Sequence, residues 1–281
     1  LVLFVSCLRI ASSQTFQTGD GDAGLQLNTI TTAVPFLMID GNAYQMSMGS
    51  VGVVASNQYH ETAYISNASL LANGHKYLSV KTDYTPWLRA LVPDINMVTF
   101  SASVAPYKRH AFGFNLKYFS LGSITFTDNV GNTIGNFNPN EFAIQTNYAH
   151  WFPMGISVGV GLKYMYSNLT GGLNVGGADT RPGQAFAADL GLTYRKYHQK
   201  SDLIGIGYSL GLGFNNMGSK MSYTQTNEED FLPINMMVGA QLNLGIEFRQ
   251  FRFEHDFAYQ VTKLMVPTPP QIDDNPYIDN E

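Results

Sequence analysis

Four segments of this sequence alternate apolar residues with small or polar residues, at a period of two. In the clearest segment, 156–167, Ile, Val, Leu and Tyr occupy every second position, and mostly Ser, Gly and Lys occupy the positions between. A period of two is the repeat of a β-strand, because its successive side chains point to opposite faces of the sheet. The same pattern appears in segments 112–119, 186–195 and 204–215. The sequence therefore predicts strands with one wholly apolar face.

The lengths of these strands, together with the composition, indicate the environment of the apolar face. The runs have 8 to 12 residues, and three of the four have 10 to 12, which is the length that a tilted strand needs to cross a bilayer. No uninterrupted apolar stretch reaches the roughly 18 to 20 residues of a membrane-spanning helix. Charged residues make up 13% of the chain, against about 25% in soluble domains. These features exclude a helical membrane protein and favour a membrane-spanning β-sheet.

The second face of the strands separates two classes of β-protein. A soluble β-sandwich or lipocalin-like barrel buries its apolar face and presents a charged face to water. Here the second face is mostly Gly, Ser, Asn and Thr, which suits the interior of a membrane barrel better. We predict an all-β fold, a transmembrane antiparallel outer-membrane β-barrel. The soluble β-fold is the alternative.

Further strands and their connections support the same architecture. Connections alternate between tight turns and the longer stretches 122–139, 168–183 and 216–230, as in outer-membrane barrels with short periplasmic turns and longer external loops. The five additional candidate strands are Lys76–Asp83, Asn96–Ala105, Glu141–Phe152, Leu232–Leu244 and Phe251–Val261.

The sequence divides into three expected regions. Residues 1–13 have the apolar run and small-residue cleavage site of a signal peptide remnant. Residues 14–75 are irregular and form an N-terminal segment that is a possible lumen plug. Residues 76–281 are expected to form an incomplete β-barrel that ends in a loop rich in Pro and Asp.

Three groups of residues carry a resemblance to a known family. They are Asp83–Arg89 with Asp94–Asn96, Tyr118–Gly122 with Ile124–Asp128, and Asn138–Ile144. Together, and in this order, they resemble the PorV family, also called LptO, whose members are type IX secretion proteins related to the FadL fatty-acid channels. The similarity runs from about Met48 to the end of the sequence. The motif positions are Tyr84, Pro86, Trp87, Asn138, Pro139, Glu141 and Phe142.

This resemblance implies a FadL-like barrel of 14 strands in the full-length protein, of which about ten would be present here and the C-terminal strands missing. It implies a location in the outer membrane of a Gram-negative cell. It further implies that the protein binds the C-terminal signal domains of secreted cargo and shuttles them from the type IX translocon channel. The destination would be the sortase PorU and its attachment complex at the cell surface.

Residue patterns that could support catalysis or metal binding are weak. The six histidines, including His110 and His150, are scattered without metal-ligand spacing. Glu254 and Asp256 share a strand face with Arg252, but paired lumen charges explain them better than acid–base chemistry. The net charge is −5 and no basic stripe exists, so nucleic acid is not an expected partner. We predict no enzyme activity, catalytic residue, cofactor or metal site.

Aromatic and apolar residues offer structural and binding roles. Trp87 and Trp151 lie toward strand ends, where aromatic rings favour the bilayer interface. Loop residues predicted to contact cargo are Phe126, Asp128, Ile134, Phe137 and Phe231.

Two other functions remain open from the sequence. A FadL-like channel for long-chain fatty acids or other hydrophobic small molecules would need an apolar lumen pocket. A purely scaffolding role among secretion proteins is the other possibility.

Overall fold

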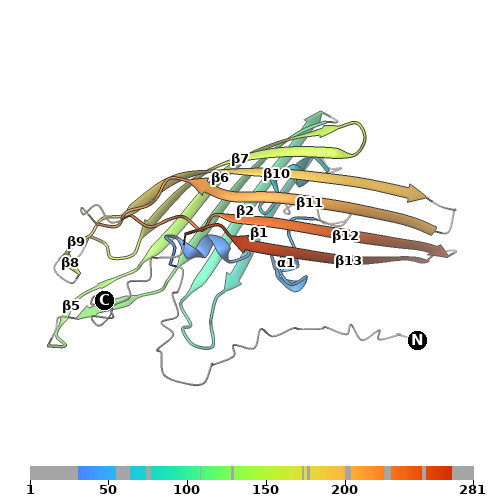
Figure 1. Cartoon of the computed structure of the whole chain (residues 1–281). Helices are drawn as coiled ribbons and strands as arrows, with labels where there is room; N and C mark the ends of the chain where they lie inside the picture. Colours follow the sequence, from blue (N-terminus) through green and yellow to red (C-terminus); the bar gives the residue numbers. More distant parts are fainter. Residues whose placement is uncertain are drawn as a thin grey trace, which may run out of the picture. The chain divides into compact units, whose positions relative to one another are not determined.

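A single antiparallel sheet of nine strands dominates the computed structural model (Figure 1). The structure describes residues 31–54, 64–73, 77–107, 109–127, 130–172, 174–175, 178–199, 204–224, 229–248 and 251–267. In spatial order the strands of the sheet are β1 (Leu78–Pro86), β2 (Asn96–Tyr107), β3 (His110–Ser120), β6 (Asn140–Phe152), β7 (Ile156–Asn168), β10 (Gly183–Gln199), β11 (Ile204–Gly218), β12 (Asn235–Phe248) and β13 (Phe251–Leu264). All nine predicted segments are strands.

Two small hairpins correct the expectation that the longer connections are plain loops. One hairpin pairs β4 (Ile124–Thr127) with β5 (Thr133–Phe137), and the other pairs β8 (Asn174–Val175) with β9 (Ala178–Asp179). Each lies between two neighbouring strands of the main sheet.

The two ends of the sheet differ, as the spacing predicts. Successive strands run antiparallel, so the connections 87–95, 121–139, 169–182 and 219–234 all lie at one end. We call this the long-loop end. The opposite end carries the short connections, such as residues 153–155 between β6 and β7, and we call it the short-turn end.

Several predicted strand boundaries differ from those observed by three residues or more, and two of them affect the connections. β12 begins at Asn235 rather than Leu232, because Leu232 is buried in a hydrophobic cluster and Pro233 has no N–H for a sheet hydrogen bond. β10 continues to Gln199, through residues expected to form a turn, and pairs with β11 as far as Gly205.

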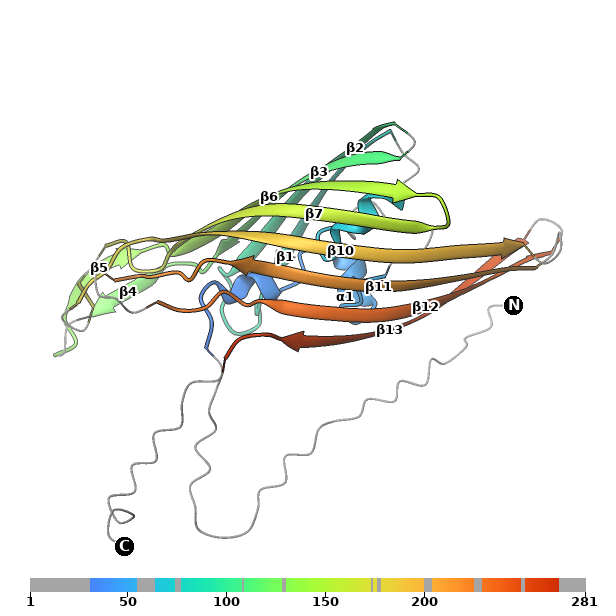
Figure 2. The same ribbon diagram turned by 45° about the horizontal axis from the view of Figure 1, so that its top comes forward.

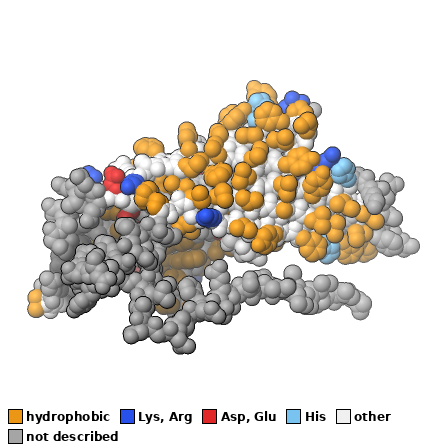
Figure 3. Space-filling view, viewed as in Figure 1, with side chains coloured by type: hydrophobic (Ala, Val, Ile, Leu, Met, Phe, Trp, Pro, Cys, Tyr) orange, Lys and Arg blue, Asp and Glu red, His pale blue; other side chains and the backbone are white. Residues whose placement is uncertain are grey.

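Exposure along the strands is the reverse of that in a soluble sheet. In β7, Val158, Val160 and Leu162 face outward and Leu162 is 68% exposed, whereas Ser157 and Gly159 are buried. Apolar side chains accordingly cover the visible outer face of the strands (Figure 3). This polarity is the organisation of an outer-membrane β-barrel. The strands β1 and β13 form the sheet edges, and neither pairs with a second neighbour among the described strands.

Helical content in the described chain is confined to short segments: η1 (Pro35–Met38), α1 (Ala43–Ser47) and η2 (Ala68–Asn73). Among the described residues, no helix has the length and hydrophobicity needed to cross a membrane. The N-terminal segment that carries these helices lies against the inward face of the sheet (Figure 2), and η2 contacts β3, β6, β7 and β10.

Candidate functional site

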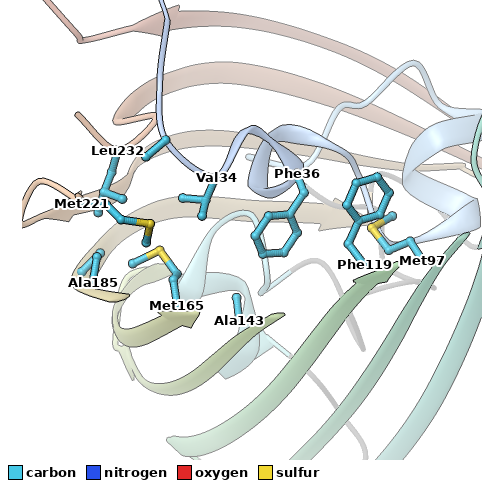
Figure 4. Packing of buried hydrophobic residues seen from close by; sticks show 11 residues of the cluster. Val34, Phe36, Met97, Phe119, Ala143, Met165, Ala185, Met221 and Leu232 are labelled. Atoms are coloured by element: carbon cyan, nitrogen blue, oxygen red, sulfur yellow. The ribbon is translucent and has the colours of Figure 1, made fainter. Parts of the chain in front are cut away.

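A hydrophobic cluster joins the N-terminal segment to the sheet at the long-loop end (Figure 4). Val34 and Phe36 point into it, and the Phe36 ring stacks on Phe119 of β3 with centroids 6.1 Å apart. Met221 and Leu232 enter from the β11–β12 connection. Residues far apart in the sequence are therefore held together just below the long loops.

Trp87, Ile95 and Leu121, which belong to two of the family-motif segments, pack against this cluster. The Trp87 amide donates to the Ile95 carbonyl at 3.1 Å, and the Leu121 amide donates to the Pro139 carbonyl at 3.1 Å, so both connections close at their bases. Trp87, expected at the bilayer interface, instead packs half-buried against the cluster. That expectation was wrong because Trp87 continues the alternation of β1, in which Ser79, Lys81, Asp83 and Thr85 face inward.

The remaining motif residues divide between the two faces of the sheet. Glu141 is buried and accepts a hydrogen bond from Ser167 Oγ at 2.6 Å. Phe142, the next residue, faces outward and stacks on Tyr166 at 5.2 Å. Asn138 contributes its carbonyl, which accepts from Asn140 Nδ2 at 3.2 Å, while Tyr84 is exposed on β1.

A carboxylate links the first two long connections. Asp94 Oδ2 accepts a hydrogen bond from the Ser123 amide at 2.9 Å. Gly122 has a φ of +79°, and a Cβ there would lie 2.3 Å from the Asp94 carboxylate. Only glycine suits this position, because it needs both a left-handed conformation and a close approach. The link fixes loop 87–95 beside the base of the β4–β5 hairpin.

The inward face of the sheet carries a buried ion pair. Lys163 Nζ of β7 lies 3.1 Å from Asp189 Oδ2 of β10, with side chains 9% and 1% exposed. Lys163 also donates to Asn216 Oδ1 at 2.6 Å, and the Asn216 amide donates to Asp189 Oδ1 at 2.7 Å. Gln145 Nε2 donates to Asp189 Oδ2 at 2.7 Å. These hydrogen bonds offset the cost of burying two charges.

Polar contacts attach the N-terminal segment to the same face. Asn67 Nδ2 donates to the Val53 carbonyl at 2.8 Å and to Thr193 Oγ1 at 3.2 Å, and its Oδ1 accepts from Ser69 Oγ at 2.7 Å. The close approach needs Gly159, where a Cβ would lie 2.3 Å from the backbone of Ala68.

Two further side chains make hydrogen bonds between the segment and the inward face of the sheet, which forms the wall of the lumen, at other positions along the strands. Lys117 Nζ donates to the Ile39 carbonyl at 2.6 Å. The Tyr64 hydroxyl donates to the carbonyls of Ala102 and Phe114 at 3.1 and 2.8 Å. Burial of this hydroxyl raises the pKa of Tyr64 above its ordinary value. The described residues of the segment are thus bonded to the sheet at several positions.

A cavity of about 190 Å³ lies between the N-terminal segment and the inward face of the sheet, and both polar and apolar side chains line it. The polar part of its lining includes Asp40, Asn42, Lys117, Gln145, Lys163 and Asn216. Both lysines already bond protein acceptors. Near these two buried amines, the cavity favours polar groups over a hydrocarbon chain.

The predicted cargo-contacting residues belong to the long-loop end, but several are partly packed. Phe137 of β5 is half-buried, and its ring lies where a Cβ on Gly171 would be 2.6 Å away. Lys220 Nζ lies over the Phe231 ring, 4.3 Å from its centroid, in a cation–π contact. Phe126 is half-buried on β4. Ile134 lies in β5. Asp128 lies outside the described residues.

Exposed apolar residues in loop 87–95 were missed as candidate contacts. Leu88 is 56% exposed, Leu91 77% and Val92 38%. Their signal in the sequence is a run of apolar residues between Pro86 and Pro93, two positions that interrupt strand pairing. Leu88 was considered only as part of a family motif, and Leu91 and Val92 lie between two motif segments.

Metal-ligating side chains form no group of three or more within the part of the chain that the structure describes. The sheet does bring together His110 and His150, which the sequence separates by 40 residues. His198 and His255 lie on other strands, and His60 and His75 are outside the described residues.

Comparison with protein-family models assigns the chain. The model for the type IX secretion system protein PorV matches residues 22–271. The chain belongs to the PorV family. This PorV-family chain is thus a protein of the type IX secretion system, from a family of outer-membrane secretion proteins. The match includes the N-terminal segment as well as the nine-stranded sheet. A search of curated proteins finds no significant match.

Proposed function

We propose that this chain binds the C-terminal signal domain of secreted cargo at its long-loop end and carries it between secretion complexes. Cargo would be received from the type IX translocon channel and delivered to the sortase PorU and its attachment complex. The protein would act as an integral multi-pass barrel in the outer membrane, with the long loops outside the cell.

The observation that carries the proposal is the exposed apolar loop 87–95 beyond the ends of β1 and β2. Leu88, Leu91 and Val92 lie on a segment that the Asp94–Ser123 hydrogen bond fixes to the β4–β5 hairpin. Apolar side chains exposed on a fixed loop favour contact with another protein. Phe126, Asp128, Ile134, Phe137 and Phe231 remain the proposed contacts of the neighbouring connections.

The contacts inside the sheet support binding of cargo at the long-loop end rather than transport of a molecule through the lumen. We propose that the N-terminal segment serves as a lumen plug, because its hydrogen bonds to β7, β10 and β3 hold it against the wall at several heights. The alternative, a FadL-like channel for fatty acids, requires an apolar pocket. The cavity has a mixed lining, and the buried amines of Lys117 and Lys163 within it weigh against that alternative.

A pull-down of a cargo signal domain with the purified, detergent-solubilised protein tests this proposal. The measured quantity is the amount of signal domain recovered. The double variant Leu91→Ser/Val92→Ser removes apolar area from the loop but leaves Trp87 and Asp94 in place. If these residues are central contacts, recovery should fall about tenfold, since central interface residues each contribute about 1 kcal/mol or more.

Tyr107→Ser is the matched control, because Tyr107 is 70% exposed at the short-turn end. It should leave recovery unchanged. Equal recovery with the Leu91/Val92 variant and the unaltered protein would exclude this loop as the contact. No recovery by the unaltered, folded protein would contradict cargo binding itself.

A further inference from the structure

The short-turn end carries a pair of histidines that no part of the secretion role explains. His110 begins β3, and His150 lies two residues before the end of β6. The two residues are direct partners in the β3–β6 register. Both side chains are half-exposed on the outward face, in the same alternation as Phe112 and Tyr148.

Their ring nitrogens converge. His110 Nδ1 and His150 Nδ1 are 3.3 Å apart, and the ring centroids are 4.5 Å apart. The hydroxyl of Tyr148, on the same face of β6, lies 2.8 Å from His110 Nδ1. Two imidazole nitrogens and one phenol oxygen therefore meet at one point of the surface.

We propose that His110 and His150 form a two-histidine binding site for a divalent transition-metal ion such as Zn²⁺. Imidazole is a preferred ligand of zinc, copper and nickel. Two nitrogens about 2.0 to 2.1 Å from one tetrahedral zinc ion lie about 3.3 Å apart. The distance between the two Nδ1 atoms already has this value, so ligation needs little movement of the strands.

Neighbouring groups hold the two rings in place. The His150 ring contacts Phe152 edge-on at 4.5 Å, and the His110 ring contacts Tyr107 edge-on at 6.2 Å. Ligation requires an unprotonated Nδ1 on each ring, so each neutral imidazole carries its N–H on Nε2. A proton carried on Nδ1 of either ring moves through solvent to Nε2 of the same ring, and the Tyr148 hydroxyl gives up its hydrogen bond with His110 Nδ1, so no net proton is released.

The site leaves coordination positions to water, and its charge environment limits its affinity. Within the described chain, the hydrogen bonds and ring contacts of the two histidines include no carboxylate. Arg109, in the same turn, stacks its guanidinium 5.9 Å from the Trp151 ring centroid, and its positive charge opposes a bound cation. We expect weaker binding than at a closed structural site with four protein ligands.

Calorimetric titration of ZnCl₂ into the untagged, detergent-solubilised protein tests the site. One ion per chain should bind. His150→Gln should weaken binding by about tenfold or more, since loss of a group that merely supports a ligand already costs about 10- to 100-fold. The matched control is His198→Gln. His198 is also exposed on the outward face at the short-turn end, but it pairs with Ile206 and stacks on Tyr208.

Electron paramagnetic resonance with Cu²⁺ gives a direct count of ligands. The unaltered protein and His198→Gln should show two coordinated nitrogens, and His110→Gln and His150→Gln should each show one. Retention of the folded form on unheated electrophoresis checks that each variant is intact. Absence of zinc binding by the unaltered protein overturns the site, as does an equal loss of affinity with His198→Gln.

Discussion

The inward and outward faces of the sheet differ most plainly at two adjacent residues of β10. Asp189 points inward, is 1% exposed and lies in the ion pair with Lys163. Leu190 points outward and is 47% exposed. In a soluble protein these environments would be exchanged, because charges remain in water and leucine is buried.

This contrast shows that the two faces of one strand can suit two different environments. Lipid accepts an apolar side chain but no charge, so the middle of the outward face carries mainly leucine, valine and aromatic residues, and the histidines lie toward the strand ends. The interior accepts charges and amides where partners satisfy them, as Asn216 and Gln145 do for Asp189. The following substitutions test the contrast, from the largest expected effect to the smallest.

Asp189→Leu should cause the largest loss of unfolding free energy, through the contacts of the inward face. Lys163 would lose its carboxylate partner, and Gln145 and the Asn216 amide would lose an acceptor. Removing one member of a buried ion pair costs about 3 to 5 kcal/mol of unfolding free energy. Denaturant unfolding in detergent, followed by tryptophan fluorescence, measures this loss.

The double variant Lys163→Met/Asp189→Leu is the control for that substitution. Replacement of a whole buried pair by apolar residues is often neutral, so most of the lost stability should return. A single variant as stable as the unaltered protein would show that Lys163 is not buried with Asp189.

Leu190→Arg should cause a smaller loss of unfolding free energy, through the outward face. Leu190 lies near the middle of β10, and arginine at the bilayer midplane costs about 2 to 4 kcal/mol in a membrane barrel. Unfolding from lipid vesicles measures the cost. Leu88→Arg in loop 87–95 should be close to neutral, and a neutral Leu190→Arg would indicate that this face contacts water.

Gly159→Val should disturb the attachment of the N-terminal segment. A Cβ at residue 159 would lie 2.3 Å from backbone atoms of both Ala68 and Ser69, so the new side chain would clash with them. Overpacking of this kind costs about 1 to 3 kcal/mol. Limited proteolysis should show faster cleavage within residues 64–73. Val160→Ile, one residue away on the outward face, should change neither stability nor cleavage.

Much of the architecture could be predicted because alternation is local. The period of two in segment 156–167 identifies β7 and assigns each residue to a face, and the loop lengths identify the long-loop end. Strand ends were harder to predict. Leu232 continues the apolar pattern into β12 but is removed from the strand by packing against Met221 and its neighbours.

The candidate sites could be predicted only in part. The alternation placed Lys163 and Asp189 on one face, but nothing in the sequence paired them, because their contact depends on the register between β7 and β10. His110 and His150 looked unrelated for the same reason. Trp87 was assigned to the bilayer interface by residue type, whereas the alternation of β1 places it on the inward face, where it packs against the hydrophobic cluster.

The sequence by itself determined the strand faces, the alternation of loop lengths and the motifs of the PorV family, since these follow from residue types at fixed spacings. Tertiary structure decided which inward side chains meet, how the N-terminal segment bonds to the sheet, and which residues Trp87 and the two histidines contact. These features depend on strand register and on contacts between residues far apart in the chain, which spacing along one strand does not encode.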